Sequence, residues 1–239
     1  MRLPFPIFLL VFCSYSIQAQ EFNSKYDLDS VYQSLSVPNQ EQYDSLFNSS
    51  DREFKEFLVF MLTMPRSSQA QLIENYQRKN DEIAALTTYF KSIVPDSVSV
   101  RIEFSPEDEI WSMPASLDFF IQTPNSNQRR GNWNLEYGNA ELDSLLAELD
   151  WNYQTLEDLK GYLDRANCIS IEYDEYYSVG YSRSGMGKYY YRIYEQELSE
   201  AEIDRLVDDC ILRYYSNSVL LEYGSGATGS LCFPDPIAE

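Results

Sequence analysis

The spacing of apolar residues changes at Pro95, and this change limits the folds that the chain can adopt. Before Pro95, apolar residues recur every three to four positions, as in amphipathic helices. After it, Val98, Val100, Ile102 and Phe104 alternate with polar residues, as in a strand with one buried face. Short turns between neighbouring strands favour antiparallel pairing. We therefore predict an α+β fold: N-terminal helices, then antiparallel sheet with helices packed on one face.

The region 20–95 is predicted to be helical. Ser50 followed by Glu53 fits a capping box, and the helix behind it ends at Pro65. Its apolar face is expected to consist of Phe54, Phe57, Leu58, Met61 and Leu62. A longer helix is expected over about 68–94.

The region 96–239 is predicted to be α+β, either separate from the helical region or continuous with it as one domain. The order helix, three strands, helix is expected twice, over residues 68–149 and 155–214, which suggests a duplicated α-β-β-β-α unit. The last helix is placed behind a capping box at Ser199. It is expected to carry the stripe Ile203, Leu206, Val207, Cys210, Ile211 and Tyr214.

Residues 1–19 have the pattern of a secretory signal peptide. Arg2 precedes a short apolar run that ends at Phe12, and Ala19 supplies a small residue at the expected cleavage site. The run is too short to span a bilayer. A lipoprotein signal acylated at Cys13 is the alternative, but Phe12 is too large for the position before it. We expect a bacterial protein that is exported to the periplasm or the cell exterior, without membrane insertion after cleavage.

Charge and composition exclude several functions. The net charge of −20 repels phosphate backbones, so we expect no nucleic acid. It favours a basic protein partner or cations, and the alternative is that it serves solubility alone. The chain has no histidine, which removes serine–histidine and cysteine–histidine nucleophiles and histidine-bound metals. Any catalysis would have to come from carboxylates, tyrosine, lysine or cysteine.

Three cysteines remain after cleavage: Cys168, Cys210 and Cys232. An exported protein keeps disulfides, and an odd number leaves one thiol over. We predict a disulfide between Cys210 and Cys232, with Cys168 buried.

The candidate binding residues lie in a predicted hairpin that turns at residues 184–187. The chain has 20 tyrosines, and eight of them crowd this region. Alternation would place half under the helices and half on an aromatic face in solvent. The turn would expose two cations with a methionine between them. The predicted binding residues are Tyr177, Tyr181, Arg183, Met186, Lys188, Tyr189 and Tyr191. The alternative is a turn and a ladder of cross-strand pairs without a binding role.

No motif predicts a cofactor or a metal. Residues 180–188 resemble a phosphate-binding loop, but Tyr189 replaces the required serine or threonine and strands flank the segment. Acidic residues cluster at Glu103 with 107–109 and at 172–175, where a glycosidase pair or a calcium site is conceivable, although no EF-hand pattern is present.

These observations favour a non-enzymatic binding or interaction protein. Two alternatives stay open: a carboxylate-based hydrolase acting on envelope polysaccharide, and a structural component of the envelope. No catalytic residue is assigned.

Overall fold

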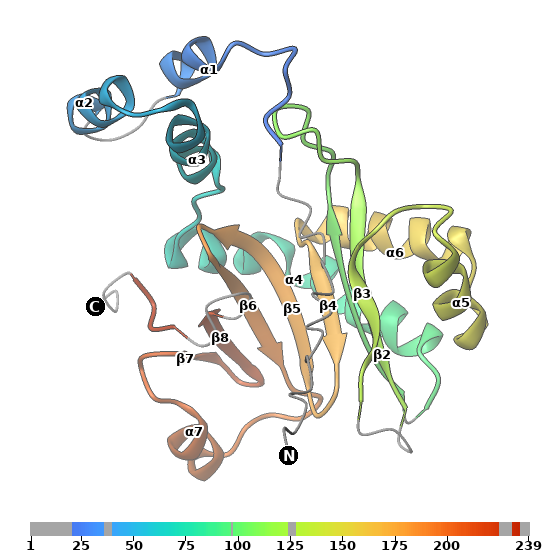
Figure 1. Ribbon diagram of the computed structural model, residues 1–239. Coiled ribbons are helices and arrows are strands. Elements are labelled where there is room, and N and C mark those ends of the chain that lie inside the picture. The colour runs from blue at the N-terminus through green and yellow to red at the C-terminus, as the bar shows by residue number, and fades with distance from the viewer. Residues whose placement is uncertain (1–20, 36–39, 97, 124–127, 225–230, 235–239) are drawn as a thin grey trace, which may run out of the picture.

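The computed structural model describes residues 21–35, 40–96, 98–123, 128–224 and 231–234. The predicted signal peptide therefore lies outside the described residues. The described chain is α+β, as predicted, with N-terminal helices followed by an eight-stranded antiparallel sheet (Figure 1).

The N-terminal region is helical, as predicted. Its helices are α1 (Leu28–Ser34), α2 (Gln40–Ser49), α3 (Arg52–Thr63) and α4 (Gln69–Ile93), of which α2 was not predicted individually. Ser68 caps α4 in a capping box with Gln71. The predicted capping box at Ser50 is wrong, because Asp51 caps α3 and accepts a hydrogen bond from the Phe54 backbone. Aspartate is as good a cap as serine, and it lies one residue closer to the helix.

The sheet has the strand order β3-β2-β1-β4-β5-β6-β8-β7. Every neighbouring pair is antiparallel. The strands are β1 (Ser99–Ser105), β2 (Ser116–Gln122), β3 (Arg130–Leu135), β4 (Ser170–Tyr173), β5 (Tyr177–Ser184), β6 (Gly187–Ile193), β7 (Leu212–Ser216) and β8 (Val219–Gly224).

Helices cover one face of this sheet. Helices α4, α5 (Ala140–Glu148) and α6 (Tyr153–Ala166) lie behind it in Figure 1. The alternating apolar residues of the strands, such as Ile102, Phe119 and Ile171, point to that side and form the main core with the helices. None of the described helices covers the opposite face, which we call the helix-free sheet face.

The expected duplication agrees with the order of elements. Helix α4 precedes β1, β2 and β3, and helix α6 precedes β4, β5 and β6. Strands β1 and β4 pair at the centre, so the two sets of three strands extend outward in opposite directions. In the order β3-β2-β1-β4-β5-β6, the first strand of each set is at the centre and its third strand is farthest out, so the two sets are arranged symmetrically. Helix α4 packs beside α6.

The predicted helix behind Ser199 is much shorter than its apolar stripe. Helix α7 covers only Glu200–Leu206, so this prediction is wrong. Of the remaining stripe residues, Val207, Cys210 and Ile211 lie in the connection that follows α7, and Tyr214 lies in strand β7. The Asp208 side chain accepts hydrogen bonds from three backbone N–H groups, of Cys210, Ile211 and Leu212. Asp209 then adopts a left-handed conformation, with φ of 57°. This turn ends the helical path and delivers Leu212 to pair with β8.

The predicted disulfide between Cys210 and Cys232 is present, and Cys168 is free and buried. Burial strongly raises the pKa of the Cys168 thiol, which keeps it protonated and unreactive. The disulfide holds the C-terminal segment against β7, where Phe233 packs on Tyr189 and Tyr223.

Helices α1 to α3 have a smaller core of their own, apart from the main one. It contains Phe22, Tyr32, Phe47 and Val59, together with Trp111 from the connection between β1 and β2. The same connection accepts a hydrogen bond from the Asn23 backbone through the Ile110 carbonyl. This connection therefore ties the N-terminal helices to the sheet.

Candidate functional site

The seven predicted binding residues do not share one surface. Tyr177, Tyr189 and Tyr191 are buried under the helices, and Tyr181 is half-buried on the same side. The Tyr191 hydroxyl donates a 2.7 Å hydrogen bond to the Leu72 carbonyl of α4, so its role in the structure is to join β6 to a helix. Burial raises the pKa of the Tyr191 hydroxyl and keeps it neutral.

The expected aromatic face in solvent is not found on the other side of these strands. Tyr190 is buried there, and Tyr176 and Tyr194 are half-buried. Tyr176 packs on Tyr194, with ring centroids 5.3 Å apart, and under the Arg192 guanidinium. These tyrosines behave as the cross-strand ladder that was the alternative interpretation.

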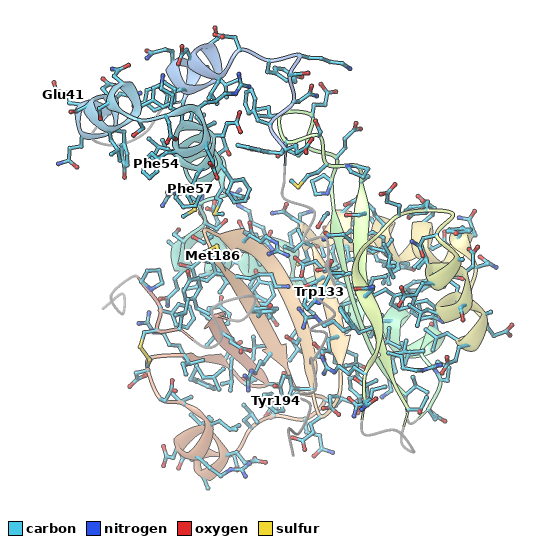
Figure 2. The ribbon with its side chains drawn as sticks, in the orientation of Figure 1. Glu41, Phe54, Phe57, Trp133, Met186 and Tyr194 are labelled. Carbon is cyan, nitrogen blue, oxygen red and sulfur yellow. A yellow bond between two sulfur atoms is a disulfide. The ribbon has the colours of Figure 1, made fainter. Side chains whose placement is uncertain are left out.

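A β-bulge in β5 changes the pairing register of the hairpin near its turn. The register of β5 and β6 shifts between Gly180 and Ser182, so Arg183 pairs with Lys188 and both point to the helix-free sheet face. The expectation that Lys188 is exposed is wrong, because only 4% of it is accessible. In the turn, the Met186 side chain is exposed (Figure 2).

Lys188 belongs to a buried ion cluster on the helix-free sheet face. Its Nζ lies 2.6 Å from Glu103 Oε2 and 3.1 Å from Ser170 Oγ. Arg183 approaches the other Glu103 oxygen, at 2.6 Å. Gly180 makes this geometry possible, because a Cβ at that position would lie 2.0 Å from Ser170 Oγ.

The contact between Ser170 and Lys188 resembles a serine–lysine nucleophile but does not fit that chemistry. In such a pair the amine must be neutral to take the proton of the serine hydroxyl. Here the Glu103 carboxylate stabilises the ammonium form of Lys188 by direct pairing. The ammonium can only donate to Ser170, so the arrangement is electrostatic and structural.

Glu103 and Asp118 are cross-strand partners whose surroundings act on them in opposite directions. Burial alone would raise the pKa of Glu103, but the charges of Lys188 and Arg183 bring it below its ordinary value. Burial raises the pKa of Asp118, and the nearby Glu103 charge adds to this. Two neighbouring carboxyls whose pKa values are moved apart are the pattern of acid–base catalysis. However, Glu103 is 1% and Asp118 4% exposed, which leaves no room for a sugar between them.

We expect the replacement Asp118→Asn to stabilise the protein at neutral pH. In the unfolded chain this carboxyl ionises near pH 3.8, whereas in the folded chain it ionises only at higher pH. Between these two values the folded state holds more protons, so the stability that Asp118 contributes falls as pH rises. The gain from the amide should therefore grow as pH increases from about 4 to 7, as measured by urea unfolding at several pH values. A gain that does not change with pH would contradict this account.

A second group of charges lies beside the first on the helix-free sheet face. Arg101 is the cross-strand partner of Glu172, and Arg129 also pairs with Glu172. The Arg101 guanidinium stands 5.2 Å from the Trp133 ring, whose other contact is an edge-on packing against Phe120, with centroids 4.8 Å apart. The Trp133 side chain is nevertheless 51% exposed.

The largest difference from the expected packing is on α3. Leu58 and Val59 are buried, whereas Phe54 is 39% and Phe57 55% exposed (Figure 2). Phe57 borders an open hollow lined by Glu21, Phe22, Glu53, Glu56, Phe57, Phe60 and Trp111. We call this hollow, together with Phe54, the α3 surface. It combines aromatic rings with three carboxylates, of which Glu56 also pairs with Arg52.

The acidic run 107–109 has local structural roles. Asp108 accepts hydrogen bonds from the backbone of Ile110 and Trp111, and Glu109 accepts one from the Tyr26 hydroxyl at 2.7 Å. Within the described ranges, no three histidine, cysteine, aspartate or glutamate side chains are grouped to hold a metal ion.

Two further results bear on function. None of the helices in the described part of the chain is both long enough and apolar enough to span a bilayer. Comparison of the chain with protein-family models, with curated proteins and with solved structures found no match.

Proposed function

We propose that this protein is a non-enzymatic binding protein of the bacterial periplasm or cell exterior, and that it holds a basic protein partner at the α3 surface. The observation that carries the proposal is the exposure of Phe57 beside a hollow with acidic residues on its rim. An exposed aromatic patch rimmed by charge is typical of an interaction site.

The charge of the rim selects the kind of partner. Glu21, Glu53 and Glu56 line the same hollow as the aromatic rings, and the whole chain carries a net charge of −20. A second copy of the chain would bring like charges together, which opposes self-association at this patch. A partner with lysine or arginine around an apolar anchor would be attracted and would bind in a salt-dependent way.

The disulfide supports the proposed location. Disulfides persist outside the cytoplasm, and the Cys210–Cys232 disulfide is what we expect in an exported protein.

The test is a pull-down with residues 20–239 from the envelope extract of the protein's own cells, at low and high salt. We expect one basic partner that is captured at low salt and lost at high salt. The replacement Phe57→Ser should abolish its capture, whereas Tyr214→Ser, at an exposed tyrosine on β7, should not. Undiminished capture by Phe57→Ser, or no captured protein, would refute the assignment to the α3 surface.

Two alternative functions have their own signatures. A hydrolase of envelope polysaccharide, for which no catalytic residue is assigned, would release reducing ends from that polysaccharide. A structural envelope component would co-purify with its neighbours in fixed proportion.

A further inference from the structure

The helix-free sheet face gathers positive charge in an otherwise acidic protein. Glu172 pairs with both Arg101 and Arg129, and Glu103 pairs with both Arg183 and Lys188. Each of these two carboxylates therefore has two cationic partners, in a chain whose net charge is −20, and Asp118, the cross-strand partner of Glu103, lies beside the second group. Glu103 and Arg101 are two residues apart on β1, so the two groups are neighbours.

Each group has one arginine within reach of a ligand. The side chains of Arg129 and Arg183 are 42% and 43% exposed, whereas that of Lys188 is 6% exposed. Arg101 and Lys188, the less exposed partners, also pair with the two carboxylates, and the Arg129 and Arg183 side chains remain partly accessible to solvent. A guanidinium group binds a carboxylate with two parallel hydrogen bonds.

Trp133 provides a flat apolar surface in the same place. Its ring is held by Phe120 and by the Arg101 guanidinium and yet is 51% exposed. The β2–β3 register is irregular here, and the Asn134 backbone donates a 3.0 Å hydrogen bond to Asp118. These contacts fix the position of the ring without covering it. In Figure 2, Trp133 is labelled at the middle of the sheet, in front of the strands.

We propose that this part of the helix-free sheet face, Arg101, Arg129, Trp133, Glu172 and Arg183, binds an acidic saccharide, namely a polymer of uronic acids. The apolar face of a sugar ring would pack on the Trp133 indole, and its carboxylate would pair with the Arg129 guanidinium. The Arg183 guanidinium, in the neighbouring charge group, would take the carboxylate of a following sugar. The partly exposed Arg129 and Arg183 guanidinium groups complement such a polymer, which the remaining acidic surface would repel.

The proposal does not depend on the α3 surface, because it uses other residues and a ligand of opposite charge. An acidic peptide is the competing ligand, since it would also be drawn to Arg129 and Arg183. A peptide of glutamate residues has no rigid ring to pack on Trp133, so the two ligands can be told apart.

The test is isothermal titration calorimetry of residues 20–239 with oligogalacturonate, with a neutral cello-oligosaccharide of equal length and with poly-glutamate. We expect oligogalacturonate to bind at low salt and to bind more weakly as salt is added. The variants Trp133→Ala and Arg129→Gln should each weaken binding about tenfold or more. Trp133→Phe should restore most of the loss, and Tyr214→Ala, with an exposed ring at the far edge of the sheet, should leave affinity unchanged.

Three results would overturn the proposal. They are no binding of oligogalacturonate by the unmodified protein, equal affinity for the neutral oligosaccharide, and binding of poly-glutamate that matches oligogalacturonate and survives Trp133→Ala. Because Phe57→Ser should leave saccharide binding intact, failure here and failure at the α3 surface can be distinguished.

Discussion

The replacement Lys188→Met should lower the free energy of unfolding by about 3–5 kcal/mol, which is the usual effect of removing one member of a buried ion pair. Methionine keeps most of the length of the side chain over Gly180 and Tyr190. However, it leaves the buried Glu103 Oε2 without the ammonium that now lies 2.6 Å away. The lost free energy of unfolding therefore reports the cost of leaving the Glu103 carboxylate buried without a partner, and not the cost of a cavity.

Urea unfolding at pH 7 measures this loss, and two variants show its origin. Lys160→Met removes an exposed partner of Asp164 on α6 and should change stability by no more than about 0.5 kcal/mol. Adding Glu103→Leu to Lys188→Met should recover most of the stability, because no buried charge is then left unpaired. If Lys188→Met costs no more than Lys160→Met, the ion cluster is not important for the fold.

The pH dependence of this loss has a definite sign. Paired cations lower the pKa of Glu103 in the folded protein, so its contribution is present above its unfolded pKa and is lost as pH falls through the folded pKa. The difference between Lys188→Met and the unmodified protein should therefore shrink in acid. A difference that is unchanged at low pH would point to packing instead of charge.

The sequence was sufficient where local chemistry decides the structure. The helical spacing of apolar residues over about 68–94 and the alternation from Val98 to Phe104 predicted α4 and β1, because side-chain periodicity is set over a few residues. The Cys210–Cys232 disulfide was also predicted. The short helix α7 was not, because the Asp208 turn and pairing with β8 override the helical spacing of Ile211 and Tyr214.

The candidate surfaces could not be predicted, because they depend on contacts between distant segments. Phe57 has helical spacing with Phe54 and Met61 and was therefore predicted to be buried, but no described element covers it. The sequence predicted an exposed Lys188 in the hairpin, but its burial depends on Glu103, which is 85 residues away in the chain. A bulge at Gly180 moved Arg183 to the face opposite Tyr181, and such an irregularity leaves little trace in the spacing of residues.

Trp111 is expected to hold the N-terminal helices to the sheet. It comes from the connection between β1 and β2, yet it packs on Phe22 and Phe60, with ring centroids 5.5 and 5.2 Å away. Its indole N–H donates to the Thr63 hydroxyl at the end of α3, at 3.3 Å. The replacement Trp111→Ala should remove about 3–5 kcal/mol of stability from this small core.

The loss caused by Trp111→Ala should be local, because the core of α1 to α3 is separate from the main core. Hydrogen exchange should become faster within residues 22–63 while the strands of the sheet stay protected. Trp151→Ala is the matched control: Trp151 is equally buried but stacks on Phe119 in the main core, so its loss should expose the whole sheet to exchange. Uniformly faster exchange in both variants would mean that the helices and the sheet unfold as one unit.

If the loss is local, the α3 surface lies on a module that can unfold without the sheet. Trp111→Ala should then abolish partner binding at the α3 surface, while the helix-free sheet face still binds its saccharide.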